Sequence, residues 1–256
     1  MNGTTPTHDS VCTVVVPCYN EEQRLPVSAF QAFIPTAPRI RFLFVNDGST
    51  DGTLTILKAL QTEFPVEVDV FDQKTNRGKA EAVRNGMLRA LVEHHAPYTG
   101  FWDADLATPL SELPRLLGLM LTTPSLELVL GSRVRLQGRL VTRRVFRHYA
   151  GRIFATLASL TLSLPIYDTQ CGAKLFRATP TLTQILATPF HSRWTFDVEM
   201  LARFLQIRRD NRAQAICALY EEPLHQWEDV GGSKLKIQDS FRAISDLLLI
   251  RRTYFE

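Results

Sequence analysis

Unbroken apolar runs alternate with amphipathic stretches along the first half of the chain. The runs at 11–16 and 40–45 show no strict alternation of apolar and polar residues, which is typical of strands covered on both faces of a parallel sheet. Residues 66–72 do alternate and predict a third strand. The five predicted strands cover residues 11–16, 40–45, 66–72, 99–105 and 126–133.

Apolar residues at helical spacing fill the intervals between these strands. In the segment 78–95, residues Ala82, Met87, Leu88 and Leu91 recur near the period of an amphipathic helix. Because strands alternate with helices, we predict an α/β fold with a mostly parallel central sheet flanked by helices. Further helices are predicted from a cap at Ser49 or Asp51 through Leu60, at 111–122 and at 194–205.

The second half of the chain has a different pattern. A basic and then apolar stretch covers 139–164. The longest apolar stretch of the chain, at 153–166, is too short and too rich in Ser and Thr to span a bilayer. The tail at 233–256 is amphipathic. No linker is visible, so we expect a disordered N-terminus at 1–10, one domain at 11–230 and an amphipathic helix at 231–256, packed on the domain or on a membrane face.

Composition and charge narrow the class of protein. Of 256 residues, 45% are hydrophobic and 21% are charged, which is ordinary for a globular protein. The net charge of +3 is too small to indicate a partner. The four cysteines form no CxxC pair and the N-terminus lacks the apolar core of a signal peptide. We expect a cytoplasmic protein with reduced thiols, able to rest on the cytosolic face of a membrane.

One part of the chain is strongly basic. Residues 128–167 contain no Asp or Glu, yet they contain seven arginines. Such a block indicates a phosphate-rich ligand, an anionic surface or nucleic acid. Aromatic residues are not interleaved with the arginines, which argues against binding of single-stranded nucleic acid. The arginines are Arg133, Arg135, Arg139, Arg143, Arg144, Arg147 and Arg152.

Polar side chains follow four of the predicted strands where each strand ends. The carboxyl ends of parallel strands meet at one edge of a sheet, where ligands bind. Asp103 and Asp105 alone are also typical of a solvated turn, but this convergence favours a site. Their oxygens suit Mg²⁺ or Mn²⁺, and such a metal would neutralise charge on a leaving nucleoside diphosphate. The converging segments are 19–21, 47–49, 103–105 and 132–133.

Other candidates have competing interpretations. Asp47 is a candidate to bind a nucleobase or ribose, or it caps a turn. Lys79 is a candidate phosphate ligand near a helix start, or it is a charge on the helix surface. His94 and His95 end a helix, and we expect them to be solvated. Neither GxGxxG nor GxxxxGK[ST] is present, which excludes the dinucleotide fingerprint and the P-loop.

Five motifs then occur in a specific order. They are "VVVPCYNEEQRLP", "VNDGSTDGT", "NRGKAEAVRNGM", "DADLATP" and "GSR". In this order and spacing the chain resembles the family 2 glycosyltransferases with the GT-A fold, over about residues 11 to 250. The later motifs "YDTQCGAKLFRA", "WTFDVEML" and "GGSKLK" resemble the branch of dolichyl-phosphate glucosyltransferases and polyprenyl-phosphate mannosyltransferases, with the glucosyltransferases closer.

The resemblance implies a nucleotide-sugar donor, a divalent metal and inversion at the anomeric carbon. Asp103 and Asp105 would hold the ribose, the metal and the diphosphate. At the position of Ala107, that branch often has a Gln that helps to bind the metal, so this chain departs from the pattern there. Nucleotide contacts would come from Pro17, Tyr19, Glu21, Asp47, Lys79 and Asp103, and contacts to an acceptor phosphate from Arg133, Arg147 and Lys234.

The acceptor is either a phosphate or a hydroxyl group. A lipid monophosphate is ionised near neutral pH, with a second pKa of roughly 6, and arginines would orient it through forked hydrogen bonds. A hydroxyl acceptor would need a general base, for which Asp168 and Asp197 are the candidates; alternatively, Asp168 only holds a tight turn. We therefore expect transfer of glucose from UDP-glucose to a polyprenyl or dolichyl phosphate. The alternatives are a soluble or glycan hydroxyl acceptor, and a non-catalytic module that binds nucleotide sugar or nucleic acid.

Overall fold

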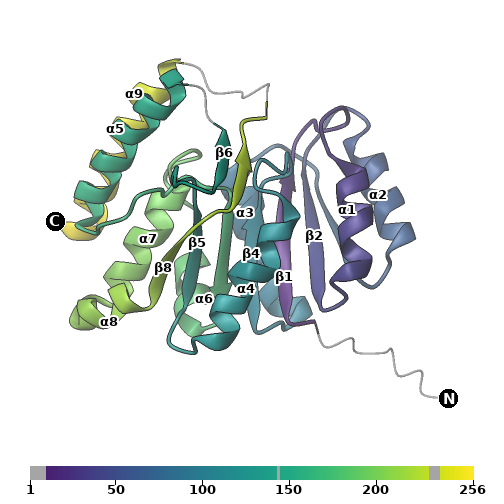
Figure 1. Ribbon diagram of the computed structural model, residues 1–256, viewed down its shortest axis with the longest axis horizontal. Coiled ribbons are helices and arrows are strands. Elements are labelled where there is room, and N and C mark those ends of the chain that lie inside the picture. Colours follow the sequence, from purple (N-terminus) through teal and green to yellow (C-terminus); the bar gives the residue numbers. More distant parts are fainter. Residues whose placement is uncertain (1–9, 143–144, 231–236) are drawn as a thin grey trace.

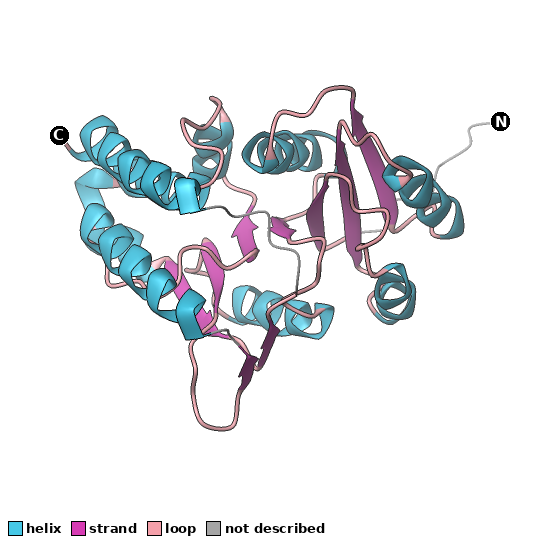
Figure 2. Ribbon diagram, turned by 90° about the horizontal axis from the view of Figure 1, so that it is seen from above, coloured by secondary structure: helices cyan, strands magenta, loops and turns pink. Residues whose placement is uncertain are grey.

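A seven-stranded sheet forms the centre of the molecule, in the order β3-β2-β1-β4-β7-β5-β8. The computed structural model describes residues 10–142, 145–230 and 237–256 (Figures 1 and 2). The predicted α/β fold with a mostly parallel sheet is confirmed. The strands are β1 (Cys12–Cys18), β2 (Ile40–Asp47), β3 (Val68–Gln73), β4 (Tyr98–Trp102), β5 (Leu128–Ser132), β7 (Ala173–Arg177) and β8 (Leu219–Pro223), with a separate parallel pair of β6 (Leu140–Thr142) and β9 (Gln226–Glu228).

Strand β7 runs against the direction of its neighbours. It pairs antiparallel with β4 on one side and with β5 on the other. The start of β7 therefore lies at the edge where β4 and β5 end. The pattern of apolar residues did not predict β7, although it lies within one of the late motifs.

Helices cover both faces of the sheet, because strand side chains alternate between the two faces. Val15 of β1 packs with one set of helices, whereas Val14 and Val16 pack with the other. The first set is α3 (Lys79–Arg89), α6 (Pro180–Leu186), α7 (Phe196–Ile207) and α8 (Arg212–Cys217); the second is α1 (Val27–Phe33), α2 (Thr53–Glu63) and α4 (Leu113–Thr122). Short helical turns lie at Ile34–Thr36, Ala90–His94, Leu110–Glu112 and Arg209–Asn211.

Two long helices lie side by side on the first of these layers, α5 (Val145–Leu162) and α9 (Ile237–Phe255) (Figure 1). Helix α9 also contacts α7, and its Leu247 and Ile250 are buried in the core. The expected disorder at 1–10 falls on residues 1–9, which lie outside the described chain. None of the helices in the described ranges has both the length and the apolar character needed to cross a membrane.

Two predicted elements end differently in the structure. The strand predicted at 99–105 stops at Trp102, so Asp103 and Asp105 lie in the turn that follows β4. The helix predicted at 78–95 consists of α3 and one π-helical turn, after which His95 takes a left-handed conformation (φ 52°). The first boundary sets the position of Asp103 and Asp105, and the second that of His94.

Candidate active site

The polar segments predicted from the sequence meet at one edge of the sheet. Strands β1, β2 and β4 are parallel, and each ends there. Because β7 is antiparallel to β4, the segment 168–172 that precedes β7 reaches the same edge. This places four loops from distant parts of the sequence around one position.

Lys79 and Asp103 make a direct ionic contact at this edge. Lys79 Nζ lies 2.5 Å from Asp103 Oδ1. Asp105 accepts a hydrogen bond from Ala107 N at 3.1 Å, and Arg24 Nη2 lies 3.9 Å from Asp105 Oδ2. Each carboxylate of the pair thus has one cationic side chain nearby, Lys79 at Asp103 and Arg24 at Asp105.

The electrostatics of these groups fit a cation site. Burial lowers the pKa of Lys79, but the charges of Asp103 and then Asp197 outweigh burial and raise the pKa above its ordinary value. Burial, followed by the charge of Asp103, raises the pKa of Asp105. When a neighbouring carboxylate raises the pKa of a carboxyl group, the nearby cationic side chains do not fully balance the negative charge, and a bound cation would stabilise the pair. The residues present therefore fit Mg²⁺ or Mn²⁺, which bind oxygen ligands.

Gly172 fixes the position of the Asp103 side chain. A methyl group at Gly172 would lie 2.0 Å from Asp103 Oδ2 and 2.1 Å from its Cγ. Asp103 N also donates a hydrogen bond to Gly172 O at 2.9 Å. The carboxylate thus packs on bare backbone, which no residue with a Cβ allows.

Asp47 holds the loop that leads into α3. Its Oδ1 accepts from Arg77 N and its Oδ2 from Gly78 N, each at 2.8 Å. Gly78 has φ +91°, which favours glycine, and Lys79 follows as the first residue of the helix. Asp47 therefore positions Lys79 through the backbone, as in the turn-capping interpretation. A contact from Asp47 to a nucleotide stays a prediction.

The loop after β1 forms another side of the site. Pro17 lies near the end of β1, and Tyr19 and Glu21 follow it. Glu21 N donates to Thr53 Oγ1 at 2.8 Å, which ties this loop to the start of α2. Arg24 Nε lies 3.6 Å from Glu21 Oε2. Arg24 was not predicted as a site residue, although it lies within the "YNEEQRLP" motif.

Arg133 and Asp168 form a two-point ion pair at the same edge. Arg133 Nε and Nη2 donate to Asp168 Oδ2 and Oδ1 at 2.6 and 2.7 Å. The backbone N–H groups of Arg133 and Gln170 also donate to this carboxylate. Four hydrogen bonds match the four acceptor sites of a carboxylate, so Asp168 is poorly placed to accept a proton. Asp168 instead orients Arg133, and this geometry gives its predicted catalytic function no support.

Arg133 also lies within electrostatic reach of Asp103. Burial lowers the pKa of Arg133, but Asp168 and, more weakly, Asp103 raise it above its ordinary value. The guanidinium carbon lies 5.4 Å from the centre of the Trp227 ring. The two other predicted acceptor contacts are not placed: the side chain of Arg147 and all of Lys234 lie outside the described part of the structure.

A second ion pair lies next to the site in the interior. Lys174 of β7 and Asp197 of α7 are 1% and 4% exposed, and their Nζ and Oδ1 atoms are 2.6 Å apart. Asp197 was a candidate base in the sequence, but it is engaged by Lys174. Lys174 was not predicted as a functional residue, and its place in the "QCGAK" motif is the signal that could have found it.

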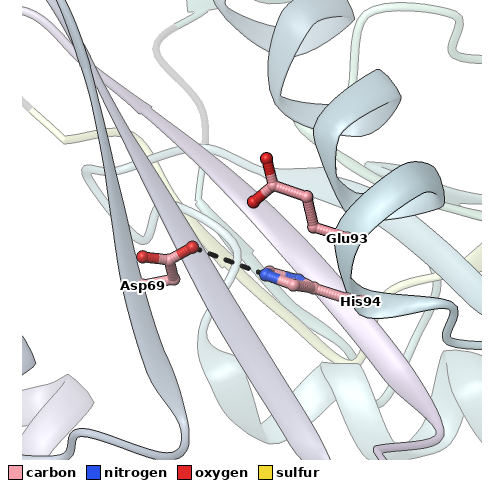
Figure 3. A group of neighbouring side chains, drawn as sticks. All are labelled: Asp69, Glu93 and His94. Carbon is pink, nitrogen blue, oxygen red and sulfur yellow. Dashed lines mark ion pairs between the residues drawn. The ribbon is translucent and has the colours of Figure 1, made fainter.

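Another group of ligand-type side chains lies at the far end of α3. Asp69, Glu93 and His94 approach one another there, and Figure 3 shows Asp69 and His94 pointing toward each other. His94 Nε2 lies 3.5 Å from Asp69 Oδ2 and its side chain is buried, so the expectation that His94 is solvated was wrong. Arg89 lies 2.7 Å from Glu93 and 3.5 Å from Asp69. Arg89 and His94 hold the carboxylates of this group, and none of the predicted nucleotide or acceptor contacts lies in it, so we make no metal proposal for it.

Comparison with known proteins places the chain among glycosyltransferases. The profile of the family described as Glycosyl transferase family 2 matches residues 13–181. The dolichyl-phosphate beta-glucosyltransferase of Drosophila melanogaster is 34% identical over 238 residues, which cover 87% of this chain and 68% of that protein. The protein of the same name from Saccharomyces cerevisiae is 31% identical, and the alignment covers 94% of this chain and 74% of that protein. The one from Homo sapiens is 32% identical, and the alignment covers 94% of this chain and 75% of that protein.

Solved structures show the same architecture. The crystal structure of glucosyl-3-phosphoglycerate synthase from Mycobacterium tuberculosis in complex with Mn²⁺, UDP-glucose and phosphoglyceric acid superposes with a TM-score of 0.68. It is 19% identical and covers 95% of this chain and 80% of that chain. At this identity the likeness concerns the fold alone, and it confirms the predicted GT-A fold. By its sequence profile and its relatives, the chain belongs to glycosyl transferase family 2.

Proposed function

We propose that this chain transfers a hexose, glucose from UDP-glucose, to a polyprenyl or dolichyl phosphate with inversion at the anomeric carbon. The observation that carries the proposal is the pair Asp103 and Asp105 at the carboxyl edge of the sheet, with Lys79 in contact. The names of the relatives support a lipid phosphate as acceptor and glucose as the sugar. The complex of the structural relative supports Mn²⁺ and UDP-glucose.

Asp103 and Asp105 would hold Mg²⁺ or Mn²⁺ in this reaction. When bound, the metal stabilises the negative charge of the leaving diphosphate. Lys79 lies in the first turn of α3, where backbone N–H groups and the helix dipole also favour a phosphate. The nucleotide would lie along the loops after β1 and β2. Its proposed contacts are Pro17, Tyr19, Glu21 and Asp47.

The engagement of both candidate bases supports a phosphate acceptor. Asp168 is occupied by Arg133, and Asp197 is occupied by Lys174. A hydroxyl acceptor would need such a base, whereas an ionised phosphate oxygen attacks without one. That oxygen forms the new bond to the anomeric carbon as the bond to UDP breaks, and no proton has to move. Arg133 would orient the acceptor phosphate, together with Arg147 and Lys234.

The proposed acceptor implies contact with a membrane surface, because a charged donor and a lipid acceptor meet only there. We place the protein in the cytoplasm, on the cytosolic face of that membrane. Helices α5 and α9 both carry exposed apolar side chains, Ile153 at 65% and Leu248 at 57% exposure. Arg251 and Arg252 on α9 are exposed as well. Apolar and basic side chains together favour binding to an anionic lipid surface.

Vesicle sedimentation tests the membrane contact. Vesicles with anionic lipid should bind the protein, and Leu248→Glu should weaken this binding. Leu121 on α4 is also exposed, at 53%, so Leu121→Glu is the matched control and should bind as the parent protein does. Equal binding by the parent and Leu248→Glu would exclude α9 as the contact.

A transfer assay tests the proposed reaction. The purified protein is given radiolabelled UDP-glucose with dolichyl phosphate, and lipid-linked glucose is extracted and measured. We expect transfer that stops with a chelator and returns with Mn²⁺ or Mg²⁺. Asp105→Asn should lose transfer, whereas Asp69→Asn, which removes a carboxylate at the far end of α3, should keep it. Transfer to a soluble sugar alone would establish a hydroxyl acceptor, and UDP-glucose binding without any transfer would favour a binding module.

A further inference from the structure

The ion pair of Lys174 and Asp197 lies in the interior and joins β7 to α7. Lys174 Nζ also donates to Cys171 O at 2.5 Å and lies 5.1 Å from the centre of the Phe101 ring. A buried ion pair often contributes no net stability, because both charges lose their hydration. Lys174 lies two residues after Gly172, against which Asp103 packs, and this points to a function at the carboxylate site. Cys171 and Gly172 directly precede β7, and Lys174 is the second residue of that strand.

Asp197 acts on Lys79 as well as on Lys174. Among the charges that raise the pKa of Lys79, Asp197 comes second only to Asp103. The ring of Phe196, the residue before Asp197, has its centre 5.9 Å from Lys79 Nζ. The ammonium of Lys79 therefore has three carboxylates within electrostatic reach: Asp103, which it contacts, Asp197 and Asp105. Of these, Asp197 alone is not one of the proposed metal ligands.

The contact of Lys79 with Asp103 competes with a metal. Lys79 Nζ lies against Oδ1 of Asp103, one of the oxygens that a divalent cation would use. The backbone before Lys79 is held by Asp47 through two N–H groups, so Lys79 can leave Asp103 only by a change in its side chain. Asp197 is the nearby carboxylate beside which the displaced ammonium of Lys79 can lie without occupying a proposed metal ligand.

We propose that Asp197 is a positioning residue that receives the Lys79 ammonium when a divalent cation binds Asp103 and Asp105. Lys79 then stays beside the site, where it can meet the diphosphate of the donor. Lys174 holds Asp197 in place through the contact of 2.6 Å. This inference rests on the metal site of the proposed function, and it adds the exchange of Lys79 between two carboxylates.

A double-mutant cycle on metal binding tests the exchange without any turnover. Mn²⁺ is titrated into the full chain, and free Mn²⁺ is followed by electron paramagnetic resonance. Asp197→Asn should weaken Mn²⁺ binding about tenfold, the lower end of what loss of a supporting partner costs a metal site, because Lys79 then remains on Asp103. In a Lys79→Gln background, the same Asp197→Asn change should alter Mn²⁺ affinity less than about twofold, because no ammonium is left to receive.

The competing explanation predicts a different pattern. If Asp197 helps the metal only through its negative charge, Asp197→Asn weakens Mn²⁺ binding by the same factor in both backgrounds, and the exchange is refuted. That result leaves the proposed function intact. A parent protein that binds no Mn²⁺, with or without UDP, refutes the metal site of the proposed function and the exchange with it.

Two further variants separate the exchange from damage to the fold. Asp197→Asn leaves Lys174 buried without its partner, so Asp197→Asn combined with Lys174→Met removes both charges and should fold. It should show the same loss of about tenfold in Mn²⁺ affinity, and no loss would overturn the proposal. Glu199→Gln removes another buried carboxylate of α7, which pairs with Arg203 at 2.7 Å, and should leave Mn²⁺ affinity unchanged.

Discussion

The two ends of helix α3 carry similar side chains in different arrangements. At its start, Lys79 contacts Asp103 from the turn after β4, and the charge of Asp197 from α7 raises the pKa of Lys79. At its far end, Arg89 contacts Glu93, four residues further along the same helical segment. The partners at the start come from elements distant in sequence, whereas the main partner at the far end is local.

The helix dipole explains what this difference means. A cation is favourable at the C-terminus of a helix and unfavourable at its N-terminus. Arg89 therefore stabilises α3, whereas Lys79 lies against the preference of its own helix and depends on carboxylates that the tertiary fold supplies. A charged side chain at the end of a helix where the dipole disfavours it indicates a functional site. A charged side chain at the end where the dipole favours it stabilises the helix.

Among variants at the two ends of α3, Asp103→Asn should have the largest effect on activity. It keeps the size of the side chain but removes a negative charge of the pair and the partner of Lys79. We expect kcat/KM for UDP-glucose to fall about 1,000-fold, which corresponds to about 4 kcal/mol of transition-state stabilisation. The measurement is steady-state transfer at saturating metal. A variant that keeps a tenth of the rate and still requires metal would contradict the assignment.

Gly172→Ala should have the next largest effect. The added methyl group would lie 2.0 Å from Asp103 Oδ2, so the carboxylate has to move. We expect about a 100-fold loss in kcat/KM, since small displacements of catalytic groups have effects of this order. Gly118→Ala in α4 is the control, because a Cβ there meets nothing within 4 Å, and its activity should be unchanged. Equal activities of the two variants would show that Gly172 does not position Asp103.

Asp69→Asn should affect stability at the far end of α3 and leave transfer unchanged. The hydrogen bond from His94 lowers the pKa of Asp69 to about 2, against about 3.9 in an unfolded chain. A lowered pKa stabilises the fold above the unfolded value, and this contribution is lost as the pH falls from about 4 to about 2. Near neutral pH the variant should be less stable by about 2 kcal/mol, and the two proteins should converge near pH 2. Denaturant unfolding at several pH values measures this, and a constant difference would refute it.

Glu93→Gln should have the smallest effect. Its partner Arg89 lies four residues away, and the Glu93 side chain is 48% exposed. Such a pair contributes about 0.3–0.5 kcal/mol, so the unfolding midpoint should barely change. Mn²⁺ binding should be the same as in the parent protein. Loss of a bound metal in this variant would show that the far end of α3 is a site after all.

The sequence predicted the fold well where a pattern repeats, as in β1, β2 and α3. It failed at β7, because five residues with Lys174 among them carry no apolar period. The antiparallel direction of β7 is decided by its pairing with β4, which lies far away in the sequence. Short strands such as β8 and β9 were missed for the same reason.

Candidate site residues were predictable where the motif order carried them, as for Asp103, Asp105 and Lys79. Their partners were not, because contacts such as Arg24 with Asp105 exist only in three dimensions. His94 was misjudged because a helical pattern does not reveal the π-helical turn, which brings this side chain against Asp69.

The antiparallel β7 has a consequence for synthesis of the chain. During translation β1 to β5 emerge first, so β4 keeps an open edge until residues 173–177 leave the ribosome. An open edge invites wrong pairing with other chains. Gly172 arrives with the same segment, and Asp103 packs against it. In the nascent protein, the pairing of β7 with β4 therefore covers the open edge of β4 and at the same time brings Gly172 against the Asp103 side chain.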